Sequence, residues 1–237
     1  MHKYAQAVKP GLAALLAVAA GRMIRTMYTL YYSPGTASMA VHLALLEIGA
    51  PHGLELVDID RLAQRSTEYL RINPQGRVPT LLIDGQPYGE VAALLMMLAD
   101  RHPQARLAPP VGTAQRNEWY QWLGYFAFEL GATYRGWFYP RDLGSAEHPP
   151  ELRTALRARI EAVWDRVDGH LRAGGPYLLG AQLSAPDLQL LMYMRWSRNM
   201  PRPALDWPAL ANFATHMRAR KSWQRLCELE GLTEWRS

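Results

Sequence analysis

Cysteine is nearly missing from this sequence, which has a single one, Cys227, among its 237 residues. One thiol cannot form an internal disulfide, and it cannot supply a cysteine-based metal site. The histidines do not supply a metal site either, because none of them stands at metal-ligand spacing from another. We therefore predict a protein with no internal disulfide and no bound metal.

Lysine is also scarce, and only Lys3, Lys9 and Lys221 occur. The formal net charge of +5 therefore comes almost wholly from arginine. The arginines are scattered among aspartate and glutamate along helical segments, a distribution that is typical of solvated helix faces. The sequence therefore predicts no nucleic-acid partner.

Long hydrophobic runs are missing as well. The apolar stretch at residues 11–20 is too short to span a membrane, so we expect no membrane span. It follows the positive residues Lys3 and Lys9 and contains small residues, and this combination imitates a secretory signal. The alternative is an upstream extension, residues 1–26, ahead of a compact domain that starts near Met27.

Residues 27–105 predict an α/β half in which strands and helices alternate. Gly49 ends the first helix, and Asn73-Pro74 follows the second. The predicted strands lie at 28–32, 54–58, 78–83 and 86–88, and the predicted helices at 39–48, 66–70 and 90–100. The order βαβα-ββα is typical of a small open sheet with helices on both faces.

Residues 113–237 predict an all-α half, because the strand pattern disappears beyond Pro103. Long helical patterns lie at 113–139, 151–173, 185–198 and 209–218, with a short one at 222–230. The clearest helix start is a capping box in which Ser184 and Asp187 exchange hydrogen bonds. The sequence therefore predicts two domains joined by a linker at residues 109–112.

The segment from Asn73 to Leu82, followed by Glu90, is the most informative part of the chain. Pro79 has no N–H for a sheet ladder, so it marks the start of a strand and leaves the Val78 backbone free. Glu90 falls in the first turn of a helix, where an exposed N-terminus favours anions. Two interpretations stay open on these residues: an edge that holds a small peptide, or a proline that merely starts an edge strand.

Four features together resemble the glutathione S-transferase family, and the likeness runs from Met27 to the end of the chain. They are Tyr31-Tyr32-Ser33-Pro34-Gly35, Asn73-Pro74-x-Gly76-x-Val78-Pro79, Glu90 with the helix through Asp100, and the capping box Ser184-x-x-Asp187. The resemblance is to bacterial, beta- and theta-like members. It implies a thioredoxin-like N-terminal domain with a cis Val78-Pro79 peptide, an all-α helical-bundle domain, and a homodimer.

The resemblance further implies reduced glutathione as co-substrate. The Val78 backbone, beside Pro79, would pair with the cysteinyl backbone of glutathione as an added strand. Glu90 would bind the γ-glutamyl ammonium, and the Val91 N–H would bind the γ-glutamyl carboxylate. Most members have a serine where this chain has Val91, so one hydroxyl contact is lost and glutathione affinity should be weaker.

Three side chains after the second strand are candidates for the glycine carboxylate of glutathione, namely Arg61, Gln64 and Arg65. For each of them, a solvated surface position is the favoured interpretation.

Activation of the thiol is the step where this chain departs furthest from its relatives. The beta class has a cysteine where this chain has Ala37, so chemistry through that cysteine is excluded. A hydroxyl in the loop after the first strand remains, and the candidates are Ser38, Thr36 and Tyr32. Ser38 and Thr36 are favoured because they stand at the start of a helix, although both are also good N-cap residues.

The pocket for the second substrate is expected along the first helix of the all-α half, where Tyr120 and Tyr134 are polar-tipped candidates. We expect the glutathione thiolate to attack a small hydrophobic electrophile. The alternatives are glutathione-dependent disulfide or peroxide reduction, or a non-catalytic binding protein. Reduced-thiol chemistry favours a cytoplasmic protein with residues 1–26 as an extension, and a periplasmic one follows if they act as a signal.

Overall fold

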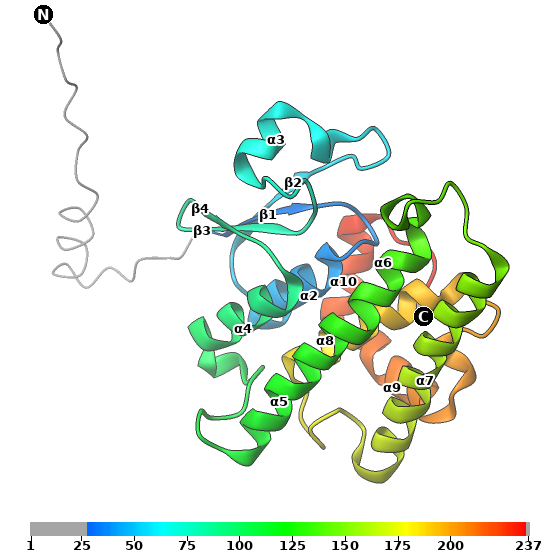
Figure 1. Ribbon diagram of the computed structural model, residues 1–237. Helices are drawn as coiled ribbons and strands as arrows, with labels where there is room; N and C mark the ends of the chain where they lie inside the picture. Colours follow the sequence, from blue (N-terminus) through cyan, green and yellow to red (C-terminus); the bar gives the residue numbers. More distant parts are fainter. Residues whose placement is uncertain (1–27, 236–237) are drawn as a thin grey trace, which may run out of the picture.

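The computed structural model describes residues 28–235, in which a small sheet is followed by a group of helices (Figure 1). The predicted N-terminal extension, residues 1–26, lies outside the described residues. Within the described range, no helix is both long enough and apolar enough to cross a membrane.

The sheet has four strands in the order β2-β1-β3-β4. These are β1 (Tyr28–Tyr32), β2 (His52–Leu56), β3 (Thr80–Ile83) and β4 (Gln86–Tyr88). β1 and β2 are parallel and are connected through α2 (Ser38–Ile48), whereas β1–β3 and β3–β4 are antiparallel. In Figure 1, α3 (Thr67–Ile72) lies above the sheet, and α2 and α4 (Val91–Arg101) lie below it. The predicted thioredoxin-like order βαβαββα is confirmed.

Alternating burial along β1 explains why the sheet packs as it does. Tyr28 and Leu30 are buried, and they pair across the ladder with Ile83 and Leu81, which are buried too. Side chains two apart on a strand point to the same face, so these four form one apolar layer over α2 and α4.

The structure moves several predicted boundaries, most clearly those of β2 and α3. β2 starts at His52, because the parallel register pairs His52 with Tyr28, and it ends at Leu56 instead of at residue 58. The chain turns at Asp58, whose carboxylate accepts hydrogen bonds from the N–H groups of Asp60 and Arg61. α3 begins one residue later than predicted because the Ser66 hydroxyl accepts the Tyr69 N–H at 3.1 Å and acts as its N-cap.

The helical half begins with what was predicted as one helix over residues 113–139. The structure divides it into α5 (Ala114–Tyr125), a π-helical segment (Phe126–Gly131) and α6 (Ala132–Phe138). The remaining long helices are α7 (Pro150–Gly174), α8 (Ala185–Trp196), α9 (Pro208–Arg218) and α10 (Lys221–Glu230). The predicted capping box of Ser184 and Asp187 is present at the start of α8.

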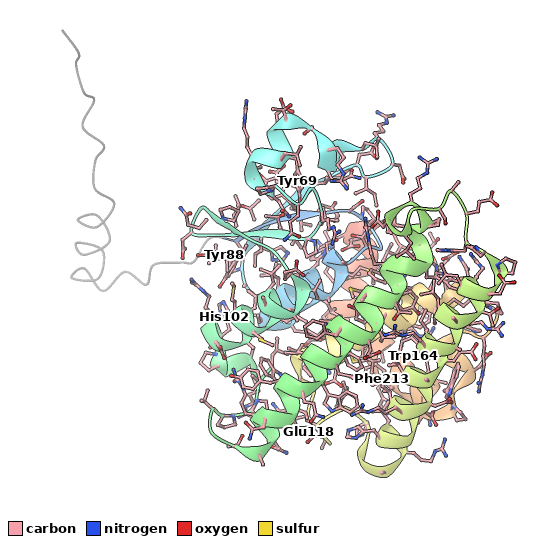
Figure 2. The ribbon with its side chains drawn as sticks, viewed as in Figure 1. Tyr69, Tyr88, His102, Glu118, Trp164 and Phe213 are labelled. Atoms are coloured by element: carbon pink, nitrogen blue, oxygen red, sulfur yellow. The ribbon has the colours of Figure 1, made fainter. Side chains whose placement is uncertain are left out.

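One continuous apolar core joins the two halves. Helix α8 is buried from Ala185 to Arg195, and it packs against α2 and α4 of the first half as well as against α5. Farther from the sheet, α7 and α9 pack through buried residues that include Trp164 and Phe213 (Figure 2). The loop after β1 therefore lies against helices from the far end of the chain.

Candidate functional site

The loop between β1 and α2 is closed by its own hydroxyl groups. The Ser38 hydroxyl donates to the Ser33 carbonyl at 3.0 Å and accepts the Ser33 N–H at 3.3 Å. The Thr36 hydroxyl donates to the same carbonyl at 2.7 Å and lies 3.0 Å from the Ser38 hydroxyl. Ser38 is fully buried and Thr36 is half-buried, and both hydroxyls stabilise the turn into α2. Neither residue is the N-cap of α2, because that position is Ala37, which receives no side-chain capping hydrogen bond.

Tyr32, the third hydroxyl candidate, ends β1 and is half-buried. Its ring lies 6.1 Å from the His42 ring. Burial raises the pKa of Tyr32 above its ordinary value, and the negative charge of Glu230 acts in the same direction. The Tyr32 hydroxyl therefore keeps its proton at neutral pH, and it takes part in none of the hydrogen bonds found between residues 28 and 235.

The helical half fixes the centre of this loop at Gly35. The Gly35 N–H donates to the Glu230 carboxylate at 2.9 Å, and the Trp196 indole N–H donates to the Gly35 carbonyl at 3.0 Å. The other Glu230 oxygen lies 2.8 Å from His42 Nδ1, and the side chains of this pair are completely buried. Gly35 has a φ of 71°, a left-handed conformation that other residues adopt only at a cost.

Glu230 and Trp196 are site residues that sequence reasoning missed. Their contacts to Gly35 join positions 195 and 161 residues apart, so no local pattern records them. In the sequence Glu230 is an ordinary helical glutamate ahead of Gly231, and only the structure shows that it is buried.

The Val78-Pro79 peptide is cis, as the family resemblance implied. The loop before it is held by Asn73, whose amide donates to the Arg77 carbonyl at 2.9 Å and to the Thr80 hydroxyl at 3.0 Å. The Tyr69 hydroxyl, on the helix above the sheet in Figure 2, donates to the same carbonyl at 2.7 Å. Val78 precedes the ladder, which begins at Thr80, and its backbone is absent from the turn, loop and cap hydrogen bonds of the described residues.

Glu90 lies beside this edge in a strained conformation. It is the exposed N-cap residue of α4, with a φ of 65° and no capping hydrogen bond from its side chain. Gly89, just before it, lies against the Pro79 carbonyl, because a Cβ placed on Gly89 would be 4.0 Å from that oxygen. A non-glycine residue at this φ costs about 1–3 kcal/mol, and such strain gathers at functional sites. The Glu90 carboxylate takes part in none of the side-chain hydrogen bonds or ion pairs found between residues 28 and 235, and Val91 is the first residue of α4.

The three candidates for the glycine carboxylate lie together in the segment between β2 and α3. Arg61 is almost fully exposed and pairs with Asp58 at 3.5 Å. Arg65 lies closer to the cis-proline loop, where its Nη1 donates to the Gln75 carbonyl at 3.4 Å. The Gln64 Oε1 atom is buried and has no hydrogen-bond partner within the described part of the chain.

The two tyrosines expected to contact the second substrate are far from equivalent. Tyr134 is 0% exposed and its hydroxyl donates to the Met200 sulfur at 3.7 Å, so it belongs to the core. Tyr120 is exposed, with the Arg116 guanidinium 4.7 Å from its ring centre. The hydrogen bonds that the helical half makes to the loop after β1 come instead from Trp196 of α8 and Glu230 of α10.

Phe138, at the end of α6, is a better-placed aromatic that the sequence did not single out. Its ring is 46% exposed and lies 6.0 Å, edge to face, from the ring of Trp196, which is bonded to Gly35. Phe138 thus presents an open apolar surface next to the loop. Sequence alone could not separate it from the other aromatics of the same helix.

A family model described as the glutathione S-transferase N-terminal domain matches residues 36–101. Glutathione S-transferase GstA of Escherichia coli O157:H7 is 30% identical over 205 residues, which are 86% of this chain and 98% of the relative. The chain belongs to the glutathione S-transferase family.

Solved structures place this transferase-family chain among bacterial beta-class-like members. A glutathione transferase homologue from Sulfitobacter, described with bound glutathione, is 30% identical, covers 86% of this chain and 98% of its own, and has a TM-score of 0.77. A beta-class enzyme from Sphingomonas chungbukensis is 28% identical with a TM-score of 0.76, over 86% of this chain and all of its own. Between residues 28 and 235, no group of three or more histidine, cysteine or carboxylate side chains is arranged to hold a metal ion.

Proposed function

We propose that this protein binds reduced glutathione and conjugates it to small hydrophobic electrophiles. One observation carries the proposal: the strained, exposed Glu90 stands at an open helix end beside the free backbone of Val78 and the cis Pro79. This arrangement offers a peptide backbone, a carboxylate and helix N–H groups to one short peptide that has both an ammonium and a carboxylate at one end.

The binding contacts follow from these groups. The Val78 backbone pairs with the cysteinyl backbone of glutathione, and Glu90 binds the γ-glutamyl ammonium. The Val91 N–H donates a hydrogen bond to the γ-glutamyl carboxylate, which is also favoured by the positive end of the α4 dipole. Arg65 supplies positive charge for the glycine carboxylate, since it lies nearer to the cis-proline loop than the exposed Arg61.

The thiol of glutathione then lies at the loop after β1. Ser38 and Thr36 already donate their protons to the Ser33 carbonyl, whereas the protonated Tyr32 hydroxyl has its proton available. We therefore favour Tyr32 as the donor to the thiolate, with Thr36 next because it is half-buried and Ser38 last. A hydrogen bond to a charged group contributes about 1.5–3 kcal/mol, which corresponds to a thiol pKa lowered by about one to two units.

The conjugation step needs no protein nucleophile. The thiol proton leaves to solvent, and the thiolate sulfur attacks an electron-poor ring carbon. A C–S bond forms while the carbon–halogen bond breaks and halide departs. Phe138 and Trp196 form the apolar wall for this second substrate, because Trp196 is bonded to the loop and Phe138 is exposed beside it.

The test compares three measurements on the purified full chain. Calorimetry with glutathione should show binding, and chlorodinitrobenzene should be conjugated faster than hydroxyethyl disulfide is reduced. Tyr32→Phe should lower conjugation roughly tenfold, since it removes one hydrogen bond to a charged group while glutathione binding persists. Tyr31→Phe on the same strand is the matched control and should leave the rate unchanged.

Other results would redirect the proposal. Faster disulfide reduction than conjugation would favour a reductase that uses a second glutathione, because the sole cysteine, Cys227, is buried. Binding without either reaction would favour a non-catalytic binding protein. The homodimer and the cytoplasmic location stay predictions, and sedimentation of the purified protein checks the first of them.

A further inference from the structure

Arg195, in the last turn of α8, is a buried cation without an ion pair. The residue is only 5% exposed, and its Nε atom has no hydrogen-bond partner among the described residues. None of the ion pairs found between residues 28 and 235 includes it. A buried charge is costly unless an opposite charge compensates it, so the position of this group needs a reason.

The Arg195 guanidinium packs against the loop after β1. A Cβ placed on Gly35 would lie 2.9 Å from Arg195 Nη1 and 3.6 Å from Cζ. Gly35 is held by two hydrogen bonds: its N–H donates to Glu230, and its carbonyl accepts from Trp196. The positive charge is therefore held against the loop at which the proposed function puts the glutathione thiol.

The acids near Arg195 are already bound to other groups. Glu230 accepts from Gly35 and lies 2.8 Å from His42, and Glu234 accepts from Arg198 at 2.6 Å. Burial lowers the pKa of Arg195 below its ordinary value, and the charge of Arg198 acts in the same direction, whereas Glu234, Cys227 and Glu230 raise it. The structure thus contains a cation with incomplete compensation beside a loop of the site.

Glu230 has the opposite effect on this loop. Its negative charge contributes to the raised pKa of Tyr32, and it would raise the pKa of a thiol bound next to Tyr32 in the same way. A thiolate there needs a positive charge that outweighs Glu230, and Arg195 is the buried cation in contact with Gly35.

We propose that Arg195 is a positioning residue for the thiolate: its guanidinium, packed on Gly35, supplies the positive charge that favours ionisation of glutathione bound at this loop. The inference rests on the proposed function, because it concerns the same bound thiol. Arg195 acts through the loop and does not touch the sulfur.

The experiment measures the pKa of the bound thiol directly, from the ultraviolet absorbance of the thiolate in the glutathione complex titrated with pH. An opposite charge within about 4–6 Å lowers a pKa by 1–3 units, and Glu230 cancels part of this effect. Arg195→Met should therefore raise the thiol pKa by about one unit. Arg195→Lys keeps the positive charge, so its thiol pKa should stay close to the wild-type value. Methionine should fold well, because replacing a buried charge by an apolar group of similar volume is often neutral.

Arg198→Gln is the matched control, since Arg198 is a neighbouring arginine that pairs with Glu234. It should leave the thiol pKa within a few tenths of a unit. The pH profile of kcat/KM gives a second measurement, in which Arg195→Met should lose about tenfold at pH 6.5 and little at high pH, where the thiol ionises in both proteins. Arg195→Gln repeats the measurement if the methionine variant does not fold.

The outcomes distinguish failure of the proposed role of Arg195 from failure of the proposed function. An unchanged thiol pKa in Arg195→Met, or a rate that falls equally at every pH, would overturn the role of Arg195 while leaving glutathione binding intact. A wild-type protein that does not bind glutathione in calorimetry would overturn the proposed function, and with it this inference.

Discussion

Replacement of Glu230 by alanine tests how strongly the helical half holds the loop after β1. The carboxylate accepts the Gly35 N–H at 2.9 Å and lies 2.8 Å from His42 Nδ1, and the Glu230 side chain is completely buried. Each hydrogen bond to a charged group contributes about 1.5–3 kcal/mol, and breaking a buried pair costs about 3–5 kcal/mol. We expect Glu230→Ala to lower the free energy of unfolding by about 4 kcal/mol, a large part of the 5–15 kcal/mol typical of a folded domain.

Glu230→Gln separates charge from hydrogen bonding. The amide oxygen still accepts the Gly35 N–H, and the amide nitrogen donates to His42 Nδ1 when that ring carries its proton on Nε2. This variant should lose only about 1 kcal/mol, because both hydrogen bonds persist as neutral ones. Glu228→Ala, on the same helix, is the matched control: Glu228 is exposed and pairs with Arg225, so less than 1 kcal/mol is expected.

The assay is urea unfolding followed by tryptophan fluorescence and by far-ultraviolet circular dichroism, with coincident transitions as the check of two-state behaviour. The double variant His42→Ala with Glu230→Ala should be less destabilised than the sum of the single variants, because the two side chains share one interaction. A loss below 1 kcal/mol for Glu230→Ala, or equal losses for the alanine and glutamine variants, would refute the reasoning.

Two further predictions concern Asp187 and Gly35. Burial raises the pKa of Asp187 from 3.8 to about 6, so the proton bound in the folded state stabilises the protein fully below pH 3.8, and this stabilisation is lost as the pH rises through 6. The difference in unfolding free energy between wild type and Asp187→Asn should fall by about 2 kcal/mol between pH 4 and 6.5, and a constant difference in urea titrations would mean that its hydrogen bonds outweigh burial. Gly35→Ala should lower the free energy of unfolding by about 2 kcal/mol or more in the same assay. The reasons are the positive φ of Gly35 and the 2.9 Å distance between the new Cβ and Arg195 Nη1. Gly49→Ala, with a φ of 70° and open space around it, is the control for the backbone cost alone, and an equal loss in both variants would contradict the contact with Arg195.

Local patterns predicted several elements of both halves well, because the signals that define these elements are local. Alternating burial along β1, the glycine that ends α2 and the capping box at Asp187 each involve residues a few positions apart. The limits of β2 were shifted because its register is set by pairing with β1, which no residue of β2 records.

The features of the candidate site likewise fall into those carried by a continuous stretch of sequence and those that depend on long-range packing. The cis Val78-Pro79 peptide was expected from the resemblance, since a continuous motif carries it. Tyr134 looked like a substrate contact because an amphipathic residue on an aromatic-rich helix has the same pattern whether it is buried or open. The contacts of Glu230 and Trp196 with Gly35 escaped prediction because they exist only after two distant helices pack against the first half.

The two hydrogen bonds to Gly35 have a consequence for how the protein unfolds. A loop that supplies part of a ligand site is ordinarily among the first segments to open locally. Here one residue, Gly35, is hydrogen-bonded to α8 and to α10, and the apolar core runs unbroken from Tyr28 to Leu232. Opening this loop therefore requires separating the sheet from the helices, so amide exchange at Gly35 should report global unfolding of a single cooperative unit.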